Sequence, residues 1–180
     1  GCGWGGFSSF LAKKYSANVT AITISRKQYE KAKQKIYEDK LTDKVDVKLL
    51  DYRNVSGKYD KIVSIEMFEA VGEKYWSKYF DVLKKNLKSD GSIGLQTITI
   101  EDKFFQKYKK FPDFIQTYIF PGGMLPSVEE MDKVITSKGL HITNKTMFGN
   151  DYAKTIRIWS ESFENSWGCI KSLGFSESFK

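Results

Sequence analysis

Histidine, cysteine and proline are scarce in this 180-residue sequence, which has one His, two Cys and three Pro. Cys2 and Cys169 form no C-x-x-C pair and no H-x-x-x-H spacing exists, which argues against a zinc site. A histidine-based triad has only His141 to use, and the apolar string GLHIT around it predicts a packed strand residue. Any chemistry must therefore rest on carboxylates, tyrosines or a cofactor.

Long hydrophobic runs are also absent. No run approaches the roughly 18 apolar residues that span a bilayer, and no basic-then-apolar signal segment opens the chain. The first residue is Gly, so we expect a cytoplasmic fragment or processed piece. Hydrophobic residues make up 41% and aromatic residues 15%, a globular composition that predicts a single domain over residues 1–180.

The net charge of +7 comes mostly from lysines at helical spacing. The sequence has no arginine-rich arm and no nucleic-acid-binding module, so we expect no nucleic-acid partner. Lysine clusters are also attracted to anionic membrane surfaces, which remain a candidate partner. The alternative is a lysine-rich composition without functional meaning.

Apolar, β-branched runs alternate with amphipathic segments along the first hundred residues. Strands are predicted at 18–24, 44–50, 59–65 and 87–100, and helices at 7–15, 26–40 and 74–88. A helix at 127–138, a strand at 140–149 and a helix at 152–170 follow. This order predicts an α/β, doubly wound (Rossmann-like) parallel sheet, in which ligands bind at the carboxyl ends of the strands.

The opening string GCGWGG has the G-x-G-x-x-G form of a turn between a buried strand and a helix. Its strand side is missing, so we expect a sheet without its first strand. A dinucleotide site needs an acidic residue about twenty positions later, where the sequence has Thr23, Ser25 and Gln28. Asp51 and Tyr52, after the strand at 44–50, can accept from an adenine amino group and stack on its ring. An adenosine-type ligand without a pyrophosphate is favoured.

Residues 101–126 interrupt the alternating pattern. The segment is aromatic and basic, and it holds all three prolines. A stretch of this length outside the alternating pattern is typical of a functional insertion, here a lid over the strand ends. The alternatives are a purely structural lid or half of a homodimer contact.

Several strings together resemble one known family: GCGWGG, VTAITIS, DYR, KIVSIEMFEAVG, YIFPGGMLPS and GNDYAKTIRIW. Over nearly all 180 residues the chain is similar to the cyclopropane fatty acid synthases and mycolic acid methyltransferases. The resemblance implies a class I methyltransferase sheet and S-adenosylmethionine as cofactor. The residues that it implies for cofactor binding are Gly1, Cys2, Gly3, Thr23, Ser25, Gln28, Tyr52, Arg53 and Ile65.

The resemblance also implies a reaction. A cis double bond of an unsaturated phospholipid acyl chain receives the methyl carbon and closes a cyclopropane ring, with a bound bicarbonate as base. Glu69, Gln96 and Tyr152 match the residues that hold this anion, and Gln96 stands where relatives have His. That difference raises a methyl- or methylene-branched product as an alternative. Tentative substrate contacts are Phe104, Phe105, Phe114, Ile119, Phe120 and Met124.

Three further expectations follow from the resemblance. The enzyme would act in the cytoplasm, at the inner face of the membrane. Family segments at both ends are not in this sequence, so the isolated chain would be weak or inactive. A small-molecule methyltransferase and a non-enzymatic cofactor-binding module remain alternative functions.

Overall fold

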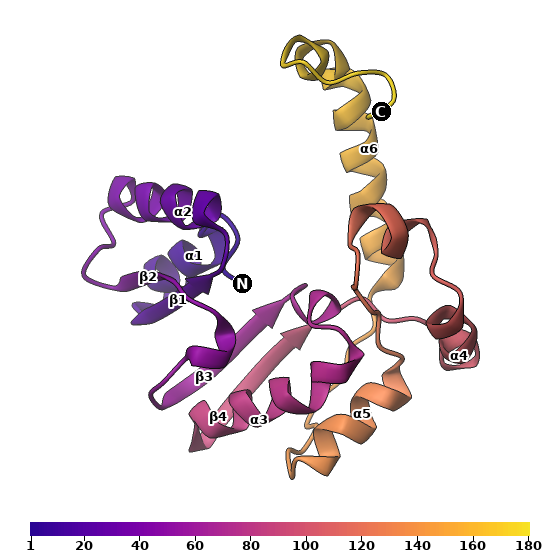
Figure 1. The fold of residues 1–180 in the computed structure, drawn as a ribbon. Coiled ribbons are helices and arrows are strands. Elements are labelled where there is room, and N and C mark those ends of the chain that lie inside the picture. Colours follow the sequence, from indigo (N-terminus) through magenta and orange to yellow (C-terminus); the bar gives the residue numbers. More distant parts are fainter. The chain divides into compact units, whose positions relative to one another are not determined.

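A computed structural model describes all 180 residues, which form two compact units, Gly1–Ile142 and Thr143–Lys180 (Figure 1). The first unit contains α1 (Gly6–Tyr15), β1 (Val19–Thr23), α2 (Arg26–Glu38), β2 (Val45–Leu49), β3 (Tyr59–Ile65), α3 (Trp76–Asn86), β4 (Leu87–Gln96), α4 (Asp102–Lys110) and α5 (Val128–Ser137). Short 3₁₀ helices η1 (Tyr52–Asn54), η2 (Phe68–Ala70) and η3 (Glu73–Tyr75) and a π-helical turn η4 (Ile115–Ile119) lie between them. The second unit is mainly α6 (Gly149–Ser172).

The strands pair in parallel, as the alternation of strands and helices predicts. β1 pairs with β2 from Val19–Val45 onward, and β3 pairs with β4 so that Ile65 lies opposite Gln96. The four strands form two separate two-stranded sheets, β1–β2 and β3–β4, in place of the one continuous sheet expected from the sequence. The candidate site residues follow the carboxyl ends of the strands in both pairs.

Helices α1 and α2 cover the β1–β2 pair (Figure 1). Small side chains allow this close approach, since Ala12, Ala21 and Ala32 are all buried at the interface. Ser25 begins α2 by accepting a hydrogen bond from the Gln28 backbone N–H, which satisfies one of the free amides at the helix start.

A second, more aromatic core surrounds α3. Phe68, Tyr79 and Phe80 are at most 2% exposed, and the Phe68 ring lies 5.1 Å from that of Tyr79. Trp76, Leu83 and two residues of the 101–126 segment, Phe105 and Met124, complete the buried cluster. The insertion is therefore part of the core at these two positions.

The prediction of a strand at 140–149 is wrong. Residues 141–148 form neither strand nor helix, and His141 is exposed rather than packed. A strand needs a ladder partner for its backbone groups, and this stretch has none in the structure. The alternating apolar residues of this stretch favour a strand locally, but they supply no partner strand.

Helix α6 has 24 residues, long enough to raise the question of a membrane span. Charged residues recur along it, and none of its residues is buried. Neither α6 nor any other helix combines the length and apolar character that crossing a bilayer requires.

Candidate active site

The first two residues of the chain lie between the carboxyl ends of β1 and β3. The Cys2 N–H donates to the carbonyl of Ile22 over 2.7 Å, and the terminal amine of Gly1 lies 3.1 Å from the Met67 sulfur. The glycine-rich turn is thus located at the strand ends, where doubly wound folds bind their ligands.

Two glycines of this turn have left-handed backbone conformations, Gly3 with φ +53° and Gly5 with φ +82°. A Cβ on Gly5 would lie 3.1 Å from the Cβ of Ala32, so glycine is also required for the contact of the turn with α2. Around Gly3 a Cβ would meet nothing within 4 Å. The open space at Gly3 is compatible with a ligand lying against the backbone, as the sequence predicts.

Thr23, Ser25 and Gln28 form one hydrogen-bonded group at the end of β1. The Thr23 hydroxyl donates to Gln28 Oε1 over 2.8 Å, and the Ser25 N–H donates to the Thr23 hydroxyl. These bonds orient the Gln28 side chain so that its amide nitrogen, which makes no hydrogen bond within the protein, can donate to a ligand hydroxyl. The structure therefore brings these three predicted cofactor residues together.

Asp51, Tyr52 and Arg53 follow β2. Arg53 binds Asp51 through two side-chain nitrogens, at 2.9 and 2.6 Å, and this pairing holds the pKa of Asp51 below its usual range. Both Asp51 oxygens are therefore already used within the protein. The Tyr52 ring packs edge-on against Tyr79, 5.5 Å between centroids, and burial raises the pKa of its hydroxyl.

Glu69 is fixed at the end of the other strand pair. Its Oε1 accepts from the backbone N–H of Ile98 over 2.6 Å, just beyond β4. Its Oε2 is buried and has no hydrogen-bond partner. A buried carboxylate oxygen without a donor is costly, so it marks a position where a ligand or water supplies one.

Gln96 is engaged by a residue that the sequence analysis did not single out. Its side-chain nitrogen donates to Glu66 Oε1 over 3.0 Å. Glu66 has φ +48°, a left-handed conformation that residues other than Gly, Asn and Asp seldom adopt. The available signal was an acidic residue directly after an apolar strand, three positions before Glu69, in IEMFEAVG.

These contacts bear on the expected bicarbonate. An anion needs donors, and the end of β4 offers the Ile98 N–H and the two N–H groups of the Gln96 amide. The Ile98 N–H and one Gln96 N–H already bind protein carboxylates, which leaves one donor. Two carboxylates disfavour a further anion beside them, so the residues of this half of the site fit a bound bicarbonate poorly.

The insertion is tied to the site through its backbone. The Met124 N–H donates to the carbonyl of Glu69 over 2.8 Å. A Cβ on Gly123 would lie 3.0 Å from the Phe120 carbonyl oxygen and 3.5 Å from that of Glu69, so only glycine fits without displacement. The FPGGM turn therefore packs directly on the turn that carries Glu69.

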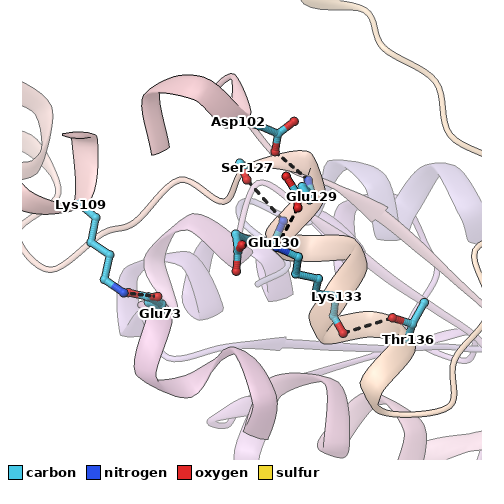
Figure 2. A network of polar contacts seen from close by, with 8 residues as sticks. All are labelled: Glu73, Asp102, Lys109, Ser127, Glu129, Glu130, Lys133 and Thr136. Atoms are coloured by element: carbon cyan, nitrogen blue, oxygen red, sulfur yellow. Dashed lines mark hydrogen bonds and ion pairs between the residues drawn. The ribbon is translucent and has the colours of Figure 1, made fainter. Parts of the chain in front are cut away.

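Polar contacts anchor the two ends of the insertion (Figure 2). Ser127 caps α5 at the Glu130 N–H, and Asp102 accepts from the Glu129 N–H over 2.9 Å. The pKa of Asp102 is lowered, chiefly by a hydrogen bond with the Ser127 side chain. At the far end of α4, Lys109 pairs with Glu73 at 2.6 Å, and Lys133 pairs with Glu129 and Glu130 on α5 (Figure 2).

The six tentative substrate residues divide into two groups. Phe105 and Met124 are core residues, 2% and 7% exposed, so their apolar character is explained by packing. The other four are exposed, with Phe114 and Phe120 at more than 60%. Three further apolar side chains of the same segment, Phe111, Ile115 and Tyr118, are exposed as well. These seven exposed side chains together are called the exposed apolar patch on residues 104–120.

Tyr152 belongs to α6 of the second unit, where its ring lies edge-on to that of Trp159 at 6.5 Å. Its expected role beside Glu69 stays a prediction. Ile65, the last residue of β3, is 37% exposed and available for contact with a ligand at the strand end.

The model of one family, described as mycolic acid cyclopropane synthetase, matches residues 1–180. The chain is 35% identical over 180 residues to "Tuberculostearic acid methyltransferase UfaA1" of Mycobacterium tuberculosis, which covers 99% of this chain and 42% of that protein. It is 36% identical over 184 residues to the cyclopropane-fatty-acyl-phospholipid synthase of Escherichia coli, covering 100% of this chain and 44% of that protein. The chain thus spans less than half of these curated relatives.

Solved structures give the same fold. The crystal structure of mycolic acid cyclopropane synthase CmaA1 complexed with SAH and CTAB is similar with a TM-score of 0.90 and 30% identity, over 99% of this chain and 66% of that one. Methyltransferases below 25% identity also match and share the fold alone. The architecture is that of class I S-adenosylmethionine-dependent methyltransferases, as the sequence analysis expects, with a partial Rossmann-like core.

Proposed function

Since the chain belongs to the mycolic acid cyclopropane synthetase family, we propose that the protein containing it transfers the methyl carbon of S-adenosylmethionine to a cis double bond in a phospholipid acyl chain. The cofactor supplies an electrophilic methyl group on a sulfonium. The product that we propose is a cyclopropane fatty acid. Residues 1–180 would form most of the catalytic domain of that protein.

The cofactor would lie along the carboxyl ends of β1 and β2. Gly1 and Gly3 carry no side chain and flank Cys2, the space around Gly3 is open, and the Gln28 amide offers donors to hydroxyl groups. Tyr52 and Arg53 would flank the adenine, although the Arg53 side chain is already held by Asp51. Ile65 would contact the cofactor near the sulfonium from the end of β3.

The observation that carries the proposal is the fixed carboxylate of Glu69. An alkene is a weak nucleophile and the cation that methylation leaves on it is easily quenched, so the site must exclude water and hold a negative charge in place. Glu69 supplies the fixed negative charge, because one oxygen is bound to Ile98 and the other is buried without a partner. We assign no step to bicarbonate.

The exposed apolar patch on residues 104–120 would contact the lipid. Its aromatic side chains suit the interface between acyl chains and headgroups. Lys107 and Lys110, on α4 beside the patch, make no ion pair within the protein and are free to bind anionic headgroups. The protein would thus work in the cytoplasm, at the inner face of the membrane.

A second product is favoured by one observation. The family His at the end of β4 is Gln96 here, bound to Glu66, and a similar chain is named a tuberculostearic acid methyltransferase. A methyl- or methylene-branched acyl chain is therefore the alternative outcome of the same methyl transfer.

The test is methyl transfer from isotope-labelled S-adenosylmethionine to vesicles of an unsaturated anionic phospholipid. We expect label in the acyl chains of unsaturated but not of saturated vesicles, and loss of at least about 100-fold in kcat for Glu69→Gln. The exposed Glu30→Gln on α2 is the matched control and should keep full activity. Label in a soluble small molecule but in no lipid would overturn the proposal.

A further inference from the structure

We propose that this site carries its own proton acceptor, the carboxylate of Glu66, in the place where the family resemblance expects a bound bicarbonate. The inference rests on the proposed methyl transfer and names a further catalytic residue for it. Three independent features of Glu66 carry it: its backbone conformation, its hydrogen bond to Gln96, and its place in the fold.

The backbone of Glu66 is held in an unfavourable region. Its φ of +48° suits glycine and is unfavourable for a residue with a Cβ. The surrounding ladder imposes this conformation, because the Glu66 N–H donates to the Gln96 carbonyl over 2.9 Å. Residues with such strained backbone conformations cluster at functional sites, where the strain helps to position a side chain.

The side chain of Glu66 is held as well. Gln96 Nε2 donates to Glu66 Oε1, and no hydrogen bond within the protein uses Glu66 Oε2. Glu66 is exposed, so this oxygen is accessible to a ligand at the strand ends. One oxygen is thus fixed and the other is free to accept a proton.

Glu66 lies at the strand ends where the proposed methyl transfer would take place. Glu66 directly follows β3, Gln96 ends the neighbouring β4, and Glu69 is bound by Ile98 two residues further on. Glu66 and Glu69 therefore bind one of the two Gln96 amide N–H groups and the Ile98 N–H, so carboxylates of the protein itself lie at the β4 end. A negative group beside the carbocation on the acyl chain stabilises it, and an accessible carboxylate oxygen can accept its proton.

In the proposed step, the carbocation on the methylated acyl chain loses a proton. One of its C–H bonds breaks, and the electron pair of that bond forms either the third C–C bond of a ring or a C=C bond. The proton passes to Glu66 Oε2, giving a neutral carboxylic acid, and later leaves to water. No other reactant is needed.

Chemical rescue tests the assignment in the full-length protein. Vesicle assays are run in buffer depleted of carbonate, with and without added bicarbonate. We expect wild-type activity to be independent of bicarbonate, and Glu66→Gly to lose about 100-fold or more and to recover on addition of bicarbonate or formate. Glu66→Gln should stay inactive with either anion, because the amide fills the space without accepting a proton. Glu30→Gln is the matched control.

A second readout needs no turnover. In calorimetry of the complex with S-adenosylhomocysteine, bicarbonate should bind saturably to Glu66→Gly and not to the wild type. Thermal unfolding of Glu66→Gly should occur at the same or a higher temperature, since glycine removes the backbone strain. Bicarbonate binding by the wild type, or full activity of Glu66→Gly without added anion, would overturn the inference. Absence of wild-type transfer to any acyl chain would overturn the proposed function and this inference with it.

Discussion

The backbone N–H of Met124 donates to the carbonyl of Glu69 over 2.8 Å, which links the FPGGM turn of the insertion to the turn that holds the site carboxylate. The side chain of Met124 is buried in the same core as Phe68, the residue before Glu69. The position of Glu69 therefore depends on packing of the insertion as well as on its own strand.

Gly123→Ala tests this dependence. The added methyl would lie 3.0 Å from the Phe120 carbonyl oxygen, so the turn must shift. We expect a loss of about 1–3 kcal/mol in the free energy of unfolding and a kcat at least about tenfold lower, measured by urea denaturation and methyl transfer. Gly168→Ala in α6, where a Cβ meets nothing within 4 Å, should keep activity. Equal activity of both variants would refute the coupling.

The contact of the glycine-rich turn with α2 gives a second prediction. Gly5 and Gly3 both have positive φ, but only at Gly5 would a Cβ approach Ala32 within 3.1 Å. We expect Gly5→Ala to destabilise the protein by about 2–4 kcal/mol, and Gly3→Ala by about 1 kcal/mol. Gly3→Ala should instead weaken cofactor binding, measured by calorimetry with S-adenosylhomocysteine. Equal free energies of unfolding for Gly5→Ala and Gly3→Ala would show that the contact of Gly5 with Ala32 does not contribute to stability.

Alkaline pH should weaken the core around Tyr79. Burial raises the pKa of Tyr79 to about 12, against the neighbouring Ser64 hydroxyl, which acts in the opposite direction. Because the folded pKa lies above the unfolded value of about 10, the contribution of protonated Tyr79 to the free energy of unfolding is fully present below about pH 10. This contribution is lost as pH rises toward 12. The two-unit difference corresponds to about 3 kcal/mol.

Tyr79→Phe removes this titrating group while keeping the ring. Urea denaturation below pH 10 and near pH 12 should show a smaller loss of stability for the variant than for the wild type. At neutral pH the variant should be about as stable as the wild type, since the Tyr79 hydroxyl has no hydrogen-bond partner to lose. The same alkaline loss in both proteins would show that other groups cause it.

Continuity of the sheet gives a fourth prediction. Gly1 and Cys2 contact Met67 and Ile22, so a strand leading into Gly1 would run between β1 and β3 and pair with both. A longer chain that supplies this strand should unfold at a higher temperature than residues 1–180 and bind S-adenosylhomocysteine more tightly. Equal unfolding temperatures and equal affinities would contradict the expected first strand.

Much of the first unit is predictable from the sequence because local signals and packing agree there. Ser25 is both a preferred cap and the observed one, and the apolar runs at 18–24 and 59–65 become β1 and β3. The strand at 140–149 fails because alternation supplies propensity without a partner for the backbone. The four strands also form two separate pairs, and the periodicity of the sequence does not indicate which strands pair with each other.

The identity of the candidate site residues is easier to predict from the sequence than the contacts that these residues make. Glu69 and Gln96 are identified by resemblance, but the hydrogen bond of Gln96 to Glu66 depends on the positive φ of Glu66, for which the sequence has no local marker. Phe105 and Met124 have the apolar character expected of lipid contacts and are used in the core. Only the fold distinguishes these two uses.

The most direct measurement is mass spectrometry of acyl chains from cells that express the full-length protein and are fed methyl-labelled methionine. The proposal predicts unsaturated chains that gain one labelled carbon and two hydrogens and lose their double bond, which is a cyclopropane. Label in a chain that keeps its double bond, or in a saturated branch, would mean the alternative product of the same transfer. Absence of label from every acyl chain would contradict the account.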